Sequence, residues 1–300
     1  MKHIFQGTGV ALVTPFKNDF SVDVEALKKV TEHTIAGGVE YLVALGTTSE
    51  APVLNKEEKK LVVKTIIEAT KNRVPLVLGV GGNNTTEIIH QLQNEAFDGI
   101  SAILSVVPYY NKPTQNGIFA HFDAIANASP LPIILYNVPG RTSANMNAET
   151  TIRLAEKHSN VIGVKEASGD LAQIMEILRR KPEHFAVISG DDALTMPMIA
   201  LGASGVISVA ANALSRQFSE MVRLQLDNKT LEARKLHYSM LPIIELLFAE
   251  GNPAGVKSLL NAMDLCKEFV RLPLVSVSQK TGSLIKSEWI QISNIKFQTK

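Results

Sequence analysis

A lysine follows a short apolar segment near the middle of the chain. Residues 161–164 read Val-Ile-Gly-Val, and Lys165 comes directly after them. A continuous apolar run of this length is typical of a buried parallel strand. Burial disfavours the ammonium form of lysine and lowers its pKa, so the free amine can attack a ketone and form a Schiff base. Lys165 is therefore a candidate nucleophile, although a single lysine at a strand end is more often a surface residue.

Further polar side chains that suit ketone chemistry also follow apolar segments. Tyr136 ends one such segment, Arg141 comes shortly after it, and Thr47 and Thr48 follow another. A phenol can carry protons, and a guanidinium offers a planar fork of N–H groups to a carboxylate. Two hydroxyls with their backbone amides, preceded by a glycine that lets the chain turn closely, can hold a second carboxylate. Together these residues predict a site for a ketone that bears a carboxylate.

The segments that carry these residues belong to a repeating pattern. Apolar segments alternate with amphipathic stretches of about 10–16 residues, and the pattern predicts eight strand–helix units. Asn55 and Asn84 each precede a Glu by three residues, which is a variant of the capping box and marks a helix start. Eight such units favour an α/β fold, the closed (β/α)8 TIM barrel, over an open doubly wound sheet. The expected strands lie near residues 8–14, 40–45, 75–80, 100–106, 132–136, 161–165, 185–189 and 204–209.

After the eighth expected strand, the pattern contains helices only. Helices are expected over residues 214–226, 231–248 and 253–263, followed by a short helix over 282–289. Residues 290–300 show no pattern. The sequence therefore predicts two regions, a catalytic barrel over residues 1–225 and a C-terminal helical appendage over residues 226–300.

The composition limits the function further. The 300 residues are 45% hydrophobic, and 30 basic and 29 acidic residues leave a net charge of +1, so no charge footprint indicates nucleic acid or an anionic membrane. Cys266 is the only cysteine, which excludes an internal disulfide and a cysteine-based metal cluster. The histidines show no metal-ligand spacing, and no signal-peptide core or membrane-length apolar segment is found. We expect a cytoplasmic protein with a small-molecule partner, no metal and no cofactor.

Taken one at a time, several of these motifs have ordinary structural explanations. The residues 46–48 (Gly-Thr-Thr) alone form an ordinary turn, and tyrosines beside prolines at 109 and 110 usually serve packing or an interface. The glycines at 79–82 lack the spacing of a dinucleotide-binding loop. Asp191 and Asp192 indicate an N-cap pair for the next helix more than an acid/base dyad.

Taken jointly, the motifs are much more specific than any one of them. The chain resembles the 4-hydroxy-tetrahydrodipicolinate synthase (dihydrodipicolinate synthase) family, within the Schiff-base-forming pyruvate aldolase superfamily. The similarity runs from Gly7 to Leu274, and one departure is Ser49, where the family usually has glycine. Its most specific blocks are residues 46–50, 108–113, 136–142, 163–167 and 189–192.

The resemblance implies a set of roles. Lys165 forms the imine with pyruvate, Tyr136 moves protons to and from that centre, and Thr47 links Tyr136 to Tyr110 in a hydroxyl relay. In this family the relay tyrosine comes from the neighbouring subunit, and the assembly is a homotetramer built as a dimer of dimers. Thr48 and the backbone of Ile207 hold pyruvate, and Arg141 binds the carboxylate of the aldehyde.

The activity implied is that of a lyase that joins pyruvate to L-aspartate 4-semialdehyde and gives 4-hydroxy-tetrahydrodipicolinate, in diaminopimelate and lysine biosynthesis. One alternative is a sister aldolase, such as N-acetylneuraminate lyase or a 2-keto-3-deoxy sugar-acid aldolase, but these enzymes generally lack the counterpart of Arg141. A second alternative is a non-enzymatic binding barrel, with which the complete set of reactive residues conflicts.

Many members of this family are inhibited by lysine, and the resemblance marks a possible regulatory site. Asn83, Glu87 and Tyr109 match positions that meet the inhibitor. Ala51, Pro52, Lys56 and Lys59 stand where strongly inhibited relatives carry Ser, Ala, His and His. Because a lysine ligand is itself cationic, two added cations near it predict weak inhibition or none.

Overall fold

A computed structural model describes residues 4–293, and eight short strands form its central sheet. Each strand is hydrogen-bonded to the next along the chain and the sheet closes on itself, which confirms the predicted (β/α)8 barrel. Successive strands from β3 to β8 pair in parallel. The strands are β1 (Gly7–Ala11), β2 (Tyr41–Ala44), β3 (Leu76–Gly79), β4 (Ala102–Val106), β5 (Ile133–Asn137), β6 (Val161–Glu166), β7 (Ala186–Ser189) and β8 (Gly205–Ser208).

Helices follow the strands as predicted. They are α1 (Val24–Ala36), α2 (Lys56–Thr70), α3 (Thr85–Asn94), α4 (Gln115–Ala128), α5 (Pro139–Thr142), α6 (Ala148–Lys157), α7 (Leu171–Arg180) and α8 (Thr195–Ala200). The capping box at the start of α2 is confirmed, because Asn55 accepts from the backbone of Glu58 and the Glu58 carboxylate accepts from the backbone of Asn55. Asn84 caps α3.

The prediction that Asp191 and Asp192 cap the next helix is wrong. Leu194 is the N-cap of α8. The carboxylate of Asp191 instead accepts from the backbone N–H groups of Ala193 and Leu194, at 2.9 and 3.2 Å. These bonds close a turn before the helix begins, since a short Asp side chain can satisfy the nearest backbone donors in place of those of the first helical turn.

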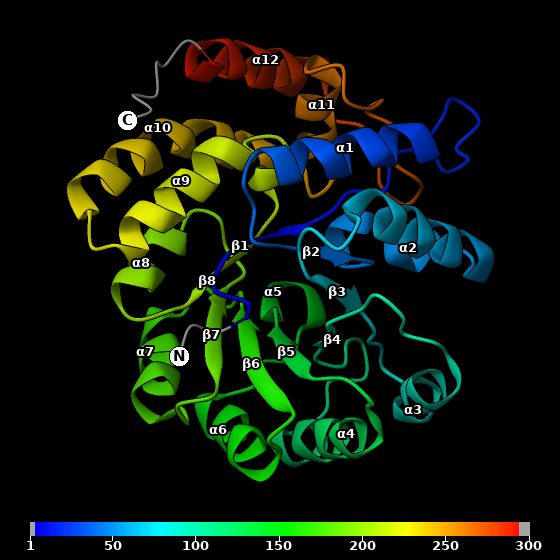
Figure 1. The fold of residues 1–300 in the computed structure, drawn as a ribbon, viewed down its shortest axis with the longest axis vertical. Helices are drawn as coiled ribbons and strands as arrows, with labels where there is room; N and C mark the ends of the chain where they lie inside the picture. Colours follow the sequence, from blue (N-terminus) through cyan, green and yellow to red (C-terminus); the bar gives the residue numbers. More distant parts are fainter. Residues whose placement is uncertain (1–3, 294–300) are drawn as a thin grey trace. The chain divides into compact units, whose positions relative to one another are not determined.

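The described residues form two compact units, and the first contains residues 4–9 with Glu40–Val43 and Pro75–Ser208. This unit carries β3 to β8 and α3 to α8. Figure 1 shows α4, α6 and α7 on the outer face of its strands, where α6 contacts both neighbouring helices and packs on β6. The strands are mostly apolar and almost completely buried, as expected when both faces are covered.

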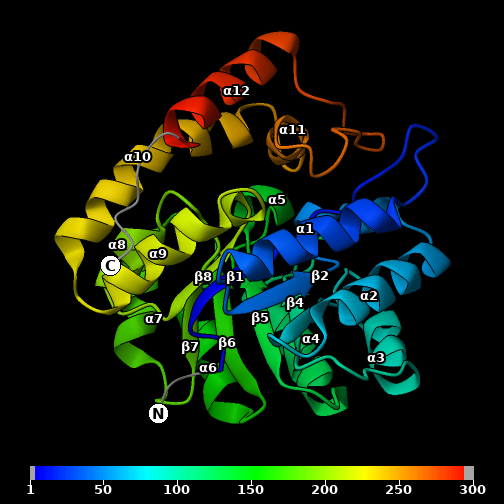
Figure 2. The same cartoon turned by 45° about the horizontal axis from the view of Figure 1, so that its top comes forward.

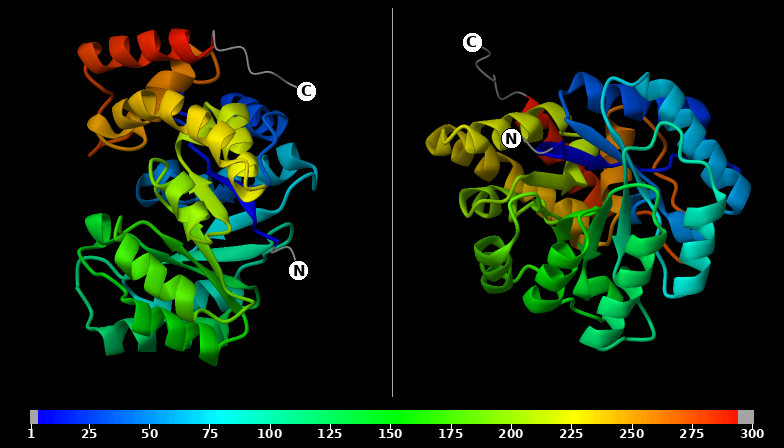
Figure 3. Two further views of the ribbon diagram at one scale, coloured as in Figure 1. Left: turned by 90° about the vertical axis from the view of Figure 1, so that its left-hand side faces the viewer. Right: turned by 60° about the horizontal axis from the view of Figure 1, so that its bottom comes forward.

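The second unit contains Val10–Val39, Ala44–Val74 and residues 209–293. It holds α1 and α2 together with the predicted C-terminal helices, which are α9 (Ser215–Leu226), α10 (Thr230–Ala249), α11 (Ala254–Ala262) and α12 (Gln279–Ser293). In Figures 2 and 3, α12 lies against α10 and α11, and α9 lies beside α10. The boundary expected at residue 225 stays a prediction, and of the segment 290–300, residues 294–300 lie outside the described residues.

Between residues 4 and 293, no helix has both the length and the apolar content needed to cross a membrane.

Candidate active site

Strands β5 and β6 place Tyr136 and Lys165 side by side. The two residues are register partners in the parallel ladder. The Nζ atom of Lys165 lies 4.4 Å from the centroid of the Tyr136 ring, within the range of a cation–π contact. Both side chains are buried, with 4% and 7% of their surfaces exposed. The structure therefore brings together the predicted nucleophile and the predicted proton carrier.

Gly190, directly after β7, leaves room for the side chain of Lys165 because it has no Cβ atom. A Cβ atom at this position would lie 2.9 Å from Cε of Lys165 and 2.7 Å from Cβ of Ala167. Carbon atoms make favourable contacts only at about 3.5–4.0 Å. Sequence reasoning assigned no role to Gly190, and the available signal was only a glycine at the end of the strand next to the lysine strand.

The residues that follow Tyr136 and Lys165 on their strands form a buried polar cluster. Asn137 donates to both carboxylate oxygens of Glu166 at 3.1 Å. The backbone N–H of Ser168 and the side chain of Gln173 on α7 also donate to Glu166, at 2.9 and 3.1 Å. Burial raises the pKa of Glu166, and these hydrogen bonds oppose the shift. The cluster joins β5, β6 and α7, and so holds the register that pairs the tyrosine with the lysine.

Arg141 lies on α5, directly after β5, and its side chain is exposed. Pro139 at the first helical turn and Ser143 in a left-handed conformation limit this helix to Pro139–Thr142. In the part of the chain that the structure describes, the guanidinium makes no hydrogen bond and no ion pair. All its donors are therefore available to a carboxylate. Ile207, the other binding residue predicted in this unit, lies buried in β8.

The residues expected at an interface and at a regulatory site lie around the segment after β4. Tyr110 has a left-handed backbone and is 89% exposed, and Tyr109 is 41% exposed. Asn83 donates to the carbonyl of Tyr109 at 3.1 Å, and the side chain of Asn111 donates to the carbonyl of Asn83 at 3.2 Å. The structure brings Asn83 and Tyr109 together, and it places Glu87 in the first turn of α3.

The second unit carries Thr47 and Thr48, which lie in the short 3-10 helix η1 (Thr47–Ser49). Thr48 is buried, and its hydroxyl accepts from Nδ2 of Asn252 at 3.0 Å. The left-handed residue of the turn is Glu50, with φ 57°, so Ser49 stands where an L-residue fits without strain. Its hydroxyl donates to the carbonyl of Gly46 at 2.7 Å. The serine that departs from the family pattern therefore closes the turn. Sequence reasoning missed Asn252, which the dipeptide Asn-Pro marks only as a turn.

Among residues 4–293, no group of three or more His, Cys, Asp or Glu side chains is arranged to hold a metal ion. Of the predicted reactive groups, the first unit carries the amine of Lys165, the phenol of Tyr136 and the guanidinium of Arg141.

Comparison with known proteins gives one consistent family. The sequence model described as the Dihydrodipicolinate synthetase family matches residues 4–289. A protein of Flavobacterium psychrophilum named 4-hydroxy-tetrahydrodipicolinate synthase is 55% identical over 275 residues, which cover 92% of this chain and 94% of the relative.

Solved structures agree with the sequence relatives. The crystal structure of dihydrodipicolinate synthase from Thermotoga maritima is similar to this chain with a TM-score of 0.94 and 36% identity, over 97% of this chain and 99% of that one. The enzyme from Cyanidioschyzon merolae, crystallised with lysine bound, gives a TM-score of 0.93 and 38% identity, also over 97% of this chain and 99% of that one.

Proposed function

Because the chain belongs to the dihydrodipicolinate synthetase family, we propose that it is a lyase that condenses pyruvate with L-aspartate 4-semialdehyde. The product is 4-hydroxy-tetrahydrodipicolinate, on the route to diaminopimelate and lysine. The observation that carries this proposal is the buried amine of Lys165 at the face of Tyr136. The amine adds to the ketone of pyruvate, and loss of water gives an imine. The protonated imine withdraws electrons, so the methyl group loses a proton and the resulting enamine attacks the aldehyde carbon.

Proton transfers at each stage need a weak acid that can also act as a base. Tyr136 has a phenol, whose ordinary pKa is about 10, close to the cationic imine that would form on Lys165. The family resemblance extends this path through Thr47 to Tyr110 of a neighbouring subunit. The 89% exposure of Tyr110 in the single chain supports that part of the proposal, as does the homotetramer implied by the family. The same resemblance supports a cytoplasmic enzyme.

Two carboxylates need separate binding groups in this reaction. Thr48 and the backbone of Ile207 hold pyruvate, and Arg141 binds the carboxylate of the semialdehyde. The exposed guanidinium of Arg141 supports its assignment to the second substrate, because its donors are free of protein partners among the described residues. An arginine after the tyrosine also favours this activity over the sister aldolases that cleave sugar acids.

An assay of the purified protein with pyruvate and a panel of aldehydes tests the proposal. Borohydride added with pyruvate reduces the imine to a stable amine, so peptide mapping should find the adduct on Lys165. Lys257, which is also fully buried, serves as an internal control and should remain unmodified. Condensation should be fastest with aspartate 4-semialdehyde. A preference for polyhydroxylated aldehydes would favour a sister aldolase, and an adduct on another lysine would refute the mechanism.

A further inference from the structure

The hydroxyl of Thr48 has one defined partner in the second unit. Asn252, two residues before the start of α11, donates its Nδ2 hydrogen to Oγ1 of Thr48 at 3.0 Å, and both side chains are buried. A hydroxyl has one hydrogen to donate and two lone pairs to accept with. Since Asn252 occupies a lone pair, the hydrogen of Thr48 is left to donate. No other side-chain hydrogen bond of Thr48 is present in residues 4–293.

A buried ion pair holds the next residues of the same turn. Nζ of Lys257, on α11, donates to Oε1 of Glu50 at 2.6 Å, and the two side chains are 0% and 1% exposed. The ammonium also donates to the carbonyl of Phe269 at 2.8 Å, and Oε2 of Glu50 accepts from the backbone of Arg271 at 2.8 Å. Because each charge has further hydrogen-bond partners, the pair is tolerated in the interior and fixes the distance between the turn and α11.

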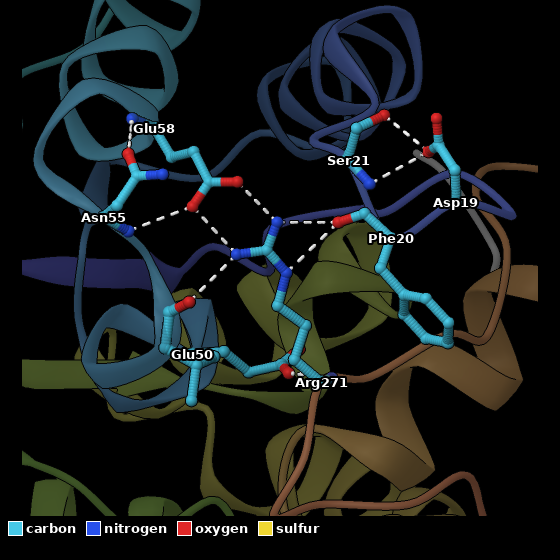
Figure 4. Close-up of polar contacts among 8 residues, drawn as sticks. Asp19, Phe20, Ser21, Glu50, Asn55, Glu58 and Arg271 are labelled. Atoms are coloured by element: carbon cyan, nitrogen blue, oxygen red, sulfur yellow. Dashed lines mark hydrogen bonds and ion pairs between the residues drawn. The ribbon is translucent and has the colours of Figure 1, made fainter.

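The Arg271 side chain extends this connection to the start of α2. Figure 4 shows its guanidinium between the carboxylate of Glu58 and the carbonyl of Phe20. It also donates to the carbonyl of Val53 at 2.9 Å. The same Glu58 carboxylate accepts from the backbone of Asn55 in the capping box. The segment from the turn to the beginning of α2 is thus held at both ends by residues of the C-terminal region.

We infer that Asn252 is a positioning residue that directs the hydroxyl hydrogen of Thr48 toward the carboxylate of pyruvate. The Lys257–Glu50 pair holds the turn against α11 so that the amide stays within reach. This inference rests on the proposed function, in which Thr48 is the pyruvate ligand. It gives the C-terminal helical region a part in substrate recognition.

Replacing Asn252 by Asp reverses the direction of the hydrogen bond at nearly constant shape. An ionised carboxylate only accepts, so the Thr48 hydroxyl must donate to it and can no longer donate to the substrate. The carboxylate of pyruvate stays the same through the reaction, so a lost contact to it weakens ground state and transition state equally. We expect Asn252→Asp to raise the KM for pyruvate by about 10- to 100-fold, with kcat nearly unchanged.

Steady-state kinetics with varied pyruvate and saturating semialdehyde measure the KM for pyruvate and kcat separately. Asn261→Asp is a matched control, because it adds the same charge at a half-exposed position of α11, the helix that follows Asn252. It should keep the KM of the unaltered protein. A merely structural role of Asn252 would lower the number of active sites, and with it kcat, at constant KM. That outcome would overturn the inference.

A double-mutant cycle keeps the test decisive if Asn252→Asp does not fold. Thr48→Val and Asn252→Ala should each raise the KM for pyruvate, and the double variant should be no worse than Thr48→Val alone, because both changes remove one interaction. Additive effects would contradict the inference. Borohydride trapping of pyruvate on the unaltered protein separates the two claims. Absence of the adduct refutes the proposed function and the inference together, whereas an adduct with native KM in the Asn252 variants refutes the inference alone.

Discussion

Gly190→Ala should slow imine formation, because the new methyl group needs the space of the Lys165 side chain. Its Cβ atom would lie 2.9 Å from Cε of Lys165, about 0.6 Å inside the ~3.5 Å at which carbon atoms make favourable contact. The methyl group would also lie 2.7 Å from Cβ of Ala167, an atom bonded directly to the backbone that cannot rotate away. The lysine must therefore move.

A displacement of about 1 Å at a reacting group can lower a rate on the order of 100-fold. For the smaller shift required here, we expect imine formation to slow by about 10- to 100-fold, or about 1.4–2.7 kcal/mol in activation free energy. Overpacking should also lower the free energy of unfolding by about 1–3 kcal/mol. The loss of rate and the loss of stability can be measured separately, because the rate of imine formation is expressed per folded active site.

The assay is the time course of borohydride-trapped pyruvate at saturating pyruvate, with urea unfolding of the same preparation. Gly82→Ala is the control, since its Cβ would meet only Cδ1 of Ile88, at 3.9 Å. It should leave both measurements unchanged. A native trapping rate in the Gly190→Ala protein, or an equal loss in the control, would refute the packing argument.

Arg141→Ala should raise the KM for the semialdehyde about tenfold or more and leave trapping of pyruvate unchanged; equal losses in both steps would contradict its role. Mixed Tyr110→Phe and Lys165→Ala proteins, each inactive alone, should regain partial activity if Tyr110 completes a neighbour's site; failure despite verified subunit exchange would place it in its own chain's site. A titration of activity with lysine at saturating pyruvate should show weak inhibition or none. Strong inhibition below about 1 mM lysine, which is the dissociation constant of a weakly bound ligand, would refute the charge argument. Hydrogen bonding to Arg271 lowers the pKa of Glu58 from 4.5 to about 2, so this carboxylate stabilises the fold above its unfolded pKa and loses that effect as the pH falls toward 2. In urea unfolding, Glu58→Gln should therefore flatten the loss of stability below about pH 4.5; an unchanged slope would show that the pair does not contribute.

The barrel was predictable because each strand is an apolar run followed by a turn, and these are local patterns. The residues at which the strands end were less predictable. Residues 8–14 were expected to form the first strand, and β1 ends at Ala11. The side chain of Asn212 accepts from the backbone of Val13 and donates to the carbonyl of Ala11. A side chain from distant sequence thus satisfies the backbone groups that would otherwise continue the ladder.

The bounds of the last helix also depend on a contact with distant sequence. A helix was expected over residues 282–289, and α12 extends over Gln279–Ser293. Its beginning is held by Ser278, whose backbone and hydroxyl both donate to Glu250, 28 residues earlier. No local pattern contains that contact.

Candidate reactive residues could be proposed from the sequence because chemistry at strand ends requires unusual residue types there. Lys165 and Tyr136 met that expectation, and the structure places them in contact. Gly190 and Asn252 could not be found in this way. A glycine is identified as necessary only by what a side chain would strike, and Asn252 acts through Thr48, from which 204 residues separate it.

The pairing of Glu50 with Lys257 also has a consequence during synthesis of the chain. The two residues are 207 positions apart, and ribosomes add about 5–20 residues per second. For about 10–40 s the nascent turn has no ammonium to neutralise its carboxylate, and an unpaired charge of this kind stays hydrated and does not enter the interior. Maturation of the turn therefore waits for α11 to be translated, and a chain that stops short of it contains every predicted site residue but lacks the contacts that hold the turn around Thr48.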